Sequence, residues 1–262
     1  MANVVNQSDT KAPNYIWDGH YPTWAGACAA ANVSGNIAEC FGSARWLQRI
    51  TQQLSDYRNE FQQYGIATPP RPSNLPLICA MTNPSTIIDF GGSSGWSWEY
   101  LKNTLPDQTI NSYVVIETKE VVNHMKSYAA HDNPVKYKTQ DESIERCDLL
   151  YCNSVLQYFS SNDPLLSLVR KAEPSYIFLE DCIAKGDKDF FSTQKYYESR
   201  IPYRFIGLHK MLKELTSYVE IVKYPYFAPI LGVMAPLEMG NFPVSNRIRY
   251  AWSILLKKLE RQ

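Results

Sequence analysis

The stretch that decides the fold is Ile87-Ile88-Asp89-Phe90-Gly91-Gly92-Ser93-Ser94-Gly95-Trp96. A short apolar run ends in a carboxylate, a glycine-rich turn follows, and Ser93 or Ser94 can cap a helix that starts near Trp96. Glycine residues tolerate positive φ and let the backbone approach a ligand closely. Because open α/β sheets bind ligands beyond the carboxyl ends of their strands, the stretch predicts a strand, a ligand-binding turn and a helix.

The position of Asp89 indicates which ligand this turn receives. A carboxylate just before the turn would repel a pyrophosphate placed on the helix N-terminus, and the spacing Asp-x-Gly-x-Ser-x-Gly lacks the middle glycine of the dinucleotide-binding loop. The carboxylate suits an ammonium group, such as that of a methionine moiety, held directly or through water. The alternative for this loop is an ordinary turn between a strand and a helix.

A second carboxylate, Glu117, closes the next apolar run, Tyr113-Val114-Val115-Ile116, and stands 28 residues after Asp89. In nucleoside-binding α/β folds, an acid at the end of the second strand accepts hydrogen bonds from ribose hydroxyls. A surface carboxylate is the alternative for Glu117 alone. Together with Asp89 and the glycines of the turn, it predicts a nucleoside site.

Apolar runs alternate with helical patterns through the rest of the chain, which is typical of a parallel sheet covered on both faces. The predicted strands are 86–90, 113–117, 135–138, 148–152 and 176–179, and the helices between them include 121–130 and 165–169. Residues 218–224 and 231–235 predict an antiparallel pair at the end of the sheet. Residues 246–259 predict a basic amphipathic helix that packs on the core or, alternatively, lies on a membrane or a partner.

A proline-rich stretch, Thr68-Pro69-Pro70-Arg71-Pro72-Ser73-Asn74, cannot continue a helix and predicts a linker. It divides the chain into an N-terminal helical cap with linker, residues 1–74, and a main domain, residues 75–262. Within the cap, residues 24–31 and 41–64 have helical patterns. The cap is too small for a core of its own, so we expect it to pack over the pocket of the main domain.

Charge and composition exclude several classes of function. Lys plus Arg equals Asp plus Glu, at 26 each, so the chain has no overall charge that attracts nucleic acid. The six cysteines form no CxxC pair and no zinc-like spacing, which predicts reduced thiols, no metal site and a reducing, cytoplasmic compartment. Residues 1–11 are polar and unlike a signal peptide, and no apolar run approaches the ~18 residues of a membrane helix.

Three segments, 89–95, 114–117 and 148–158, resemble the first, second and fourth motifs of class I S-adenosylmethionine-dependent methyltransferases. More narrowly, the chain resembles a bacterial group of methyltransferase-like proteins associated with surface-polysaccharide loci. The segments that carry this second resemblance are Trp17-Asp18-Gly19-His20-Tyr21, residues 89–93, Leu156-Gln157-Tyr158 and Ile201-Pro202-Tyr203-Arg204-Phe205. The resemblance covers most of the chain.

The resemblance implies a Rossmann-like α/β fold with a mostly parallel seven-stranded sheet, an antiparallel last strand and an N-terminal helical cap. It implies S-adenosylmethionine as the cofactor and O-methylation of a small-molecule or glycan-precursor acceptor in surface-glycan biosynthesis. Asp89 and the glycines would line the methionine side, Glu117 the ribose and Asp141 the adenine. The full set of cofactor-binding candidates is Asp89, Gly91, Gly92, Ser93, Gly95, Glu117, Asp141, Asn153 and Ser154.

Methyl transfer is a displacement for which positioning supplies much of the barrier reduction, and a general base is needed only for a hydroxyl or a protonated amine. The candidate catalytic residues are Glu180 and Asp181, which follow the fifth apolar run, and His209. The alternatives are a solvated loop for the pair and a helix cap for His209. The candidate substrate-binding residues are His20, Tyr21, Gln157, Tyr158, Tyr203 and Arg204, and the last two alternatively only pack.

Two other functions stay open at this point. One is a non-catalytic cofactor-binding module of the same fold, and the other is an NAD-dependent oxidoreductase. Asp89 before the turn argues against the oxidoreductase, whereas nothing in the sequence separates the module from the enzyme. The sequence also gives no oligomeric state.

Overall fold

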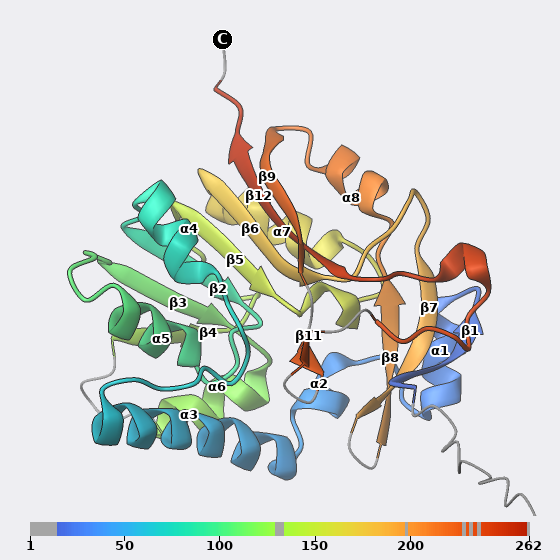
Figure 1. Ribbon diagram of the computed structural model, residues 1–262, viewed down its shortest axis with the longest axis horizontal. Helices are drawn as coiled ribbons and strands as arrows, with labels where there is room; N and C mark the ends of the chain where they lie inside the picture. Colours follow the sequence, from blue (N-terminus) through green and yellow to red (C-terminus); the bar gives the residue numbers. More distant parts are fainter. Residues whose placement is uncertain are drawn as a thin grey trace, which may run out of the picture.

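The computed structural model describes residues 15–128, 134–196, 199–226, 229–230, 233–234 and 237–260. Its centre is a seven-stranded sheet with the strand order β4-β3-β2-β5-β6-β12-β9 (Figure 1). The strands are β2 (Thr86–Phe90), β3 (Ser112–Ile116), β4 (Val135–Lys138), β5 (Leu149–Asn153), β6 (Tyr176–Cys182), β9 (Tyr218–Tyr226) and β12 (Ala251–Lys258). β12 runs antiparallel to both of its neighbours, and the pairings among β2 to β6 are parallel. This confirms the predicted α/β class with an antiparallel last strand.

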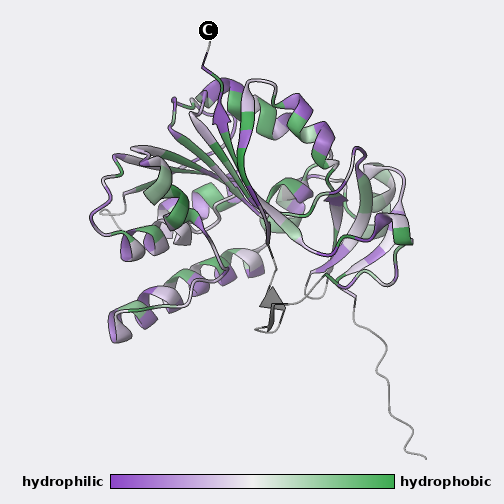
Figure 2. Ribbon diagram, turned by 45° about the horizontal axis from the view of Figure 1, so that its top comes forward, coloured by the Kyte–Doolittle hydropathy of each residue, from purple (hydrophilic) through white to green (hydrophobic). Residues whose placement is uncertain are grey.

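The central strand β5 is apolar almost throughout because helices cover both faces of the sheet. Leu149, Leu150, Tyr151 and Cys152 of β5 are all buried. One apolar cluster joins the strands to α7 (Asp163–Ala172) and α8 (Leu208–Glu214). The other joins them to α3 (Ala44–Tyr64), α4 (Leu75–Thr82), α5 (Trp96–Thr104) and α6 (Lys119–Tyr128). Figure 2 shows the apolar residues concentrated along the sheet between the two layers of helices.

The predicted C-terminal helix over 246–259 is wrong, because most of that segment is the strand β12. Ile254 and Leu256 pack in one apolar cluster, whereas Leu255 packs in the other. Successive side chains therefore enter opposite faces of the sheet. A short apolar run buried on both sides does not have the periodicity that distinguishes strand from helix, and this explains the error.

The predicted antiparallel pair at the end of the sheet is half correct. Residues 218–224 lie in β9, but their antiparallel partner is β12 rather than the segment 231–235. That segment contributes β11 (Val233–Met234), which pairs with β10 (Pro229–Ile230) in a separate two-stranded sheet. The final strand is inserted between β6 and β9, and sequence neighbours do not reveal such an insertion.

The N-terminal segment is only partly helical. Helices α1 (Trp24–Ala31) and α3 match the two predicted helices, with α2 (Ile37–Phe41) between them. However, β1 (Trp17–Tyr21) is a strand that pairs with β7 (Phe190–Tyr196), and β7 pairs with β8 (Ser199–Phe205). The cap thus combines the N-terminal helices with a three-stranded sheet to which a later part of the chain contributes two strands. The division at residue 74 stays a prediction.

Among the described helices, none combines the length and the hydropathy that a membrane crossing requires. All six cysteines are free thiols, and five of them are buried.

Candidate functional site

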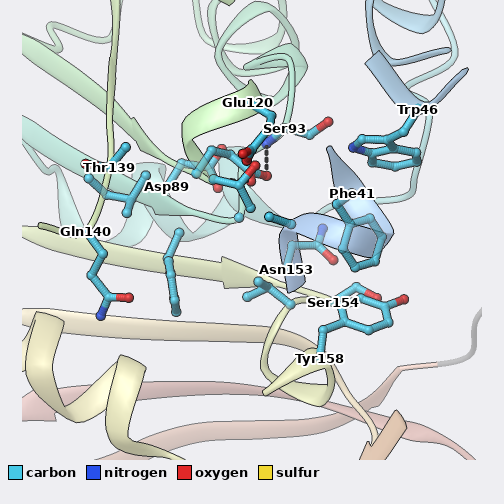
Figure 3. Close-up of a pocket in the computed structure, with 18 of the residues that line it drawn as sticks. Phe41, Trp46, Asp89, Ser93, Glu120, Thr139, Gln140, Asn153, Ser154 and Tyr158 are labelled. Atoms are coloured by element: carbon cyan, nitrogen blue, oxygen red, sulfur yellow. Dashed lines mark hydrogen bonds between the residues drawn. The ribbon is translucent and has the colours of Figure 1, made fainter. Parts of the chain in front are cut away.

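A cavity of about 460 Å³ lies at the carboxyl ends of β2, β3, β4 and β5. The turns after these strands form one end of the cavity, and side chains of α2, α3, the proline-rich linker and β7 form the other. Figure 3 shows Phe41, Trp46 and Tyr158 grouped on one side and Thr139 and Gln140 on the opposite side. Of the predicted cofactor residues, the lining includes Asp89, Gly91, Gly92, Ser93, Glu117, Asp141, Asn153 and Ser154.

Asp89 is the most deeply buried acid of the cavity, with 1% of its surface exposed. The Tyr113 hydroxyl donates a hydrogen bond to Asp89 Oδ2 at 2.7 Å. Burial raises the pKa of Asp89 to about 7, and the nearby charge of Glu117 adds to the shift, whereas the hydrogen bonds from Tyr113 and Ser97 oppose it. The carboxyl group therefore changes charge near neutral pH, where a bound cation would favour the ionised form.

The turn after β2 requires glycine at two positions for different reasons. Gly91 has φ +74°, and a Cβ there would lie 2.3 Å from Val155 Cγ2. At Gly92 a Cβ would lie 2.5 Å from Asp89 Oδ2, so only glycine lets the turn fold over this carboxyl group. Gly95 stands outside the cavity lining as the N-cap residue of α5. The glycines thus shape the turn, and Gly91 and Gly92 face the cavity.

Glu117 follows β3 and lies beside the same turn. The backbone N–H of Ser93 donates to Glu117 Oε1 at 3.1 Å, and that of Thr118 donates to Oε2 at 2.9 Å. Burial raises the pKa of Glu117, and these two hydrogen bonds oppose the shift. Since β2 and β3 are parallel neighbours with Phe90 opposite Ile116, the acids at their ends face one cavity, as predicted.

Asn153 is the last residue of β5 and Ser154 follows it, and both line the cavity between its two ends. The Asn153 Nδ2 group donates to the Tyr151 hydroxyl at 2.8 Å, and no described group pairs with its buried Oδ1. Ser154 has φ +54°, and its Oγ accepts a hydrogen bond from Gln157 Nε2 at 2.7 Å. Gln157 is buried and lies outside the lining, so it positions Ser154 rather than the ligand.

Two of the three predicted bases do not fit a catalytic role. Glu180 is 1% exposed and accepts hydrogen bonds from Ser73 Oγ at 2.9 Å, Asn74 N at 2.7 Å and Tyr151 OH at 2.7 Å. Its carboxylate therefore anchors the end of the linker before α4. His209 is exposed on α8, 3.2 Å from Asp187 Oδ1, and lies outside the lining.

Asp181 is a better candidate, although it stands behind the lining rather than in it. Burial raises its pKa, and the neighbouring Ser154 hydroxyl and the positive charge of Arg71 oppose that rise. No described group pairs with the buried Asp181 Oδ1. The backbone has φ +53°, an uncommon conformation for a residue with a side chain.

Of the predicted substrate-binding residues that remain, only Tyr158 lines the cavity. His20 and Tyr21 lie on β1, outside the lining, and His20 Nε2 is 3.0 Å from Asn246 Nδ2. Tyr203 and Arg204 are fully buried, and the Arg204 guanidinium donates to Leu156 O at 3.2 Å. These two residues pack beneath the cavity, as the alternative interpretation had it.

Six residues that close the other end of the cavity were not predicted from the sequence, namely Phe41, Trp46, Arg49, Gln53, Arg71 and Tyr196. The only available signal was on α3, where Trp46, Arg49 and Gln53 recur at steps of three and four and so share one face. Polar side chains on such a face are usually solvated, so the pattern alone does not reveal a cavity.

Comparisons with known proteins give weak similarities only. No family model and no curated protein matches the chain. Among solved structures, an S-adenosylmethionine-dependent methyltransferase from Mesorhizobium loti is 11% identical over 71% of this chain and 97% of its own, with a TM-score of 0.46. A glycopeptide N-methyltransferase complexed with S-adenosyl-L-homocysteine is 10% identical over 70% and 87%, with a TM-score of 0.45. A pericyclic reaction enzyme is 10% identical over 66% and 43%, with a TM-score of 0.43.

Similarities of this strength do not establish a family or an activity. The strand order and the cavity, by contrast, are properties of the chain itself. They define a Rossmann-like α/β protein with a candidate ligand cavity at the carboxyl ends of its parallel strands, where two acids lie beside a glycine-rich turn.

Proposed function

We propose that this protein transfers a methyl group from S-adenosylmethionine to an oxygen of a small-molecule or saccharide acceptor. The observation that carries the proposal is the placement of Asp89 and Glu117 at one cavity, on either side of the glycine-rich turn. Its volume of about 460 Å³ lies within the roughly 300–1,000 Å³ of small-molecule sites. The resemblance to proteins of surface-polysaccharide loci favours a glycan precursor, and the free thiols agree with a cytoplasmic location.

The residues of the cavity fit the cofactor's functional groups one by one. Asp89, when ionised, attracts the ammonium group of the methionine moiety. Glu117 keeps lone pairs for the ribose hydroxyls beyond the two N–H groups that it accepts. The segment from Thr139 to Asp141 lies across the cavity, where a polar edge suits adenine. When bound, S-adenosylmethionine supplies a methyl group on a sulfonium sulfur, which is a good leaving group.

A hydroxyl acceptor also needs a route for its proton, and Ser154 and Asp181 provide one. Ser154 lines the cavity, Gln157 Nε2 donates to its hydroxyl, and this hydroxyl is near enough to Asp181 to oppose the rise in the pKa of Asp181. In the proposed step, the acceptor oxygen bonds to the methyl carbon and the carbon–sulfur bond breaks towards sulfur. The acceptor proton passes to Ser154 Oγ as the serine proton passes to Asp181.

Calorimetry with S-adenosylmethionine, S-adenosyl-L-homocysteine and NAD tests the cofactor assignment. We expect the first two to bind and NAD not to bind. Asp89→Ala and Glu117→Ala should each weaken binding by about 1–3 kcal/mol, the cost of removing a partner from a buried polar group. Binding of NAD alone would overturn the assignment, and unchanged affinity in both variants would count against the site.

The pH dependence of this binding tests Asp89 specifically. Since its pKa is raised to about 7, Asp89 is mostly protonated near pH 6 and mostly ionised near pH 7.5. Affinity for S-adenosylmethionine should therefore rise about fivefold over that interval, before the ligand's own ammonium group loses its proton near pH 8. The Asp89→Asn variant should bind weakly with a nearly flat profile. An equally steep profile in that variant would assign the titration to another group.

Release of S-adenosyl-L-homocysteine over a panel of glycosides and sugar nucleotides tests the proton route. With any accepted hydroxyl, Asp181→Asn should lower turnover by about 10²–10⁴-fold, the usual contribution of a general base, with cofactor affinity unchanged. Gln157→Glu is a useful second variant, because it places a new charge against Ser154 without touching the ligand. Full turnover in Asp181→Asn would exclude the route. Cofactor binding without turnover on the whole panel would favour the non-catalytic module.

A further inference from the structure

The end of the cavity away from the glycine-rich turn contains a ring cluster, defined here as Phe41, Trp46, Tyr158 and Tyr196. Their ring centroids lie 4.8 Å apart for Phe41 and Tyr158, 5.6 Å for Phe41 and Tyr196, and 5.7 Å for Trp46 and Tyr196. The rings come from α2, α3, β7 and the short 3₁₀ helix Leu156–Tyr158. Four separate segments therefore converge on one aromatic surface that lines the cavity.

The ring cluster also contains an unsatisfied donor. Trp46 Nε1 is buried, and no described group accepts its hydrogen bond. A buried N–H without a partner costs free energy unless something else accepts from it. The nearby Tyr158 hydroxyl does not accept from Trp46, and it donates its own proton to Gln194 Oε1 at 3.1 Å. An acceptor atom of a bound ligand would satisfy Trp46.

Two arginines accompany the ring cluster at this end. Arg49 lies one turn along α3 from Trp46, on the face that lines the cavity. Arg71, on the linker, lines the cavity too, and its positive charge opposes the rise in the pKa of Tyr158 and of Asp181. Burial nevertheless raises the pKa of Tyr158 to about 12, so its hydroxyl stays neutral at physiological pH. The described lining residues at this end are thus mostly aromatic, neutral or cationic, with the carboxylate Glu120 beside Gly42 as an exception.

The charges of the cavity are unevenly distributed. Asp89 lies in β2, Glu117 and Asp141 follow β3 and β4, and Glu120 of α6 lies against Gly42, the residue after Phe41. Lys119 is the one described cation from these segments. The two arginines belong to α3 and the linker. An acidic end suits a cationic cofactor, and a basic end suits an anionic partner, since opposite charges are stabilised in a site partly closed to water.

We propose that the ring cluster, with Arg49 and Arg71, binds an acceptor in which a sugar or other flat ring carries a carboxylate or a phosphate. The inference rests on the proposed function only for the assignment of the cofactor to the end that contains Asp89 and Glu117. What it predicts is the ligand preference of the end that contains the ring cluster. The ring would stack on the aromatic surface, and the anion would pair with the arginines and accept from Trp46. Arginine suits both anions because its planar group donates two parallel hydrogen bonds.

The test uses three probes that share one scaffold, which are phenyl β-D-glucoside, its 6-phosphate and phenyl β-D-glucuronide. Each is titrated into the full chain saturated with S-adenosyl-L-homocysteine. We expect at least one anionic probe to bind about tenfold more tightly than the neutral glucoside. The phosphate and the glucuronide distinguish the two kinds of anion. Equal affinity for all three probes would overturn the inference.

Matched variants locate the anion site. Arg49→Gln and Arg71→Gln should each remove most of the preference for the anion, while affinity for S-adenosyl-L-homocysteine stays unchanged. Arg58→Gln is the control, because Arg58 is also on α3 but pairs with Glu99 outside the cavity. A preference that survives in both cavity variants, or that falls equally in the control, would also overturn the inference. If the probes discriminate but S-adenosyl-L-homocysteine does not bind, the cofactor assignment fails and the anion site remains.

Discussion

Replacing Gly91 with alanine should destabilise the protein by roughly 2–4 kcal/mol. Part of this cost is the backbone, because φ at Gly91 is +74° and an L-residue there is strained by about 1 kcal/mol. The rest is overlap, since the new Cβ would lie 2.3 Å from Val155 Cγ2, and overpacking of this kind costs about 1–3 kcal/mol. Urea unfolding followed by tryptophan fluorescence measures the change.

Gly65→Ala separates the two contributions. Gly65 has φ +72°, nearly the same as Gly91, but nothing lies within 4 Å of its added Cβ. This control should lose only about 1 kcal/mol, the backbone term. Adding Val155→Ala to Gly91→Ala removes the methyl groups that overlap and should recover part of the stability. A Gly91→Ala variant no less stable than Gly65→Ala would show that the turn does not pack against Val155 as described.

The positions of Asp89 and Glu117 could be predicted, because they depend only on the residues next to them and on the way neighbouring parallel strands align. Asp89 and Glu117 each follow an apolar run, and parallel strands that are neighbours bring their carboxyl ends together. No knowledge of the remaining chain was needed. Asn153 and Ser154 were expected there from the resemblance to methyltransferases, and they line the cavity because β5 is the other neighbour of β2.

The ring end was not predictable for the opposite reason. Phe41, Trp46, Tyr158 and Tyr196 are spread over more than half of the chain, and Tyr196 lies on β7, which pairs with β1 and β8 in a sheet outside the main one. That sheet holds the strand β1, which has only five residues and includes Gly19 at φ +80°. Such a segment shows no clear alternation of apolar and polar residues, so its pairing cannot be found from periodicity.

The surroundings of Glu180 and the strand β12 were both hard to predict from the sequence, for one physical reason. A buried carboxylate and a two-sided apolar strand both take their meaning from partners that are distant in the sequence. Ile254 and Leu255 of β12 face different clusters, and Glu180 contacts a linker more than a hundred residues away. Local patterns describe one side of such an interaction only.

Glu180→Ala should therefore lower the free energy of unfolding by about 3 kcal/mol. The carboxylate accepts from Ser73, Asn74 and Tyr151, and removing it leaves several buried donors without a partner. The linker before α4 would lose its anchor at the carboxyl end of β6. Chemical unfolding of the variant, with the cofactor absent, measures this loss directly.

Glu173→Ala is the matched control for this loss. Glu173 pairs with two cations, Arg146 and Lys258, but its side chain is 45% exposed, so we expect little change in the free energy of unfolding. A catalytic Glu180 would behave in the reverse way, with normal stability and lost turnover, because a base needs an oxygen free to take a proton. Since the described donors already occupy both oxygens of Glu180, a stable but inactive Glu180→Ala variant would contradict the hydrogen-bond network that joins β6 to the linker.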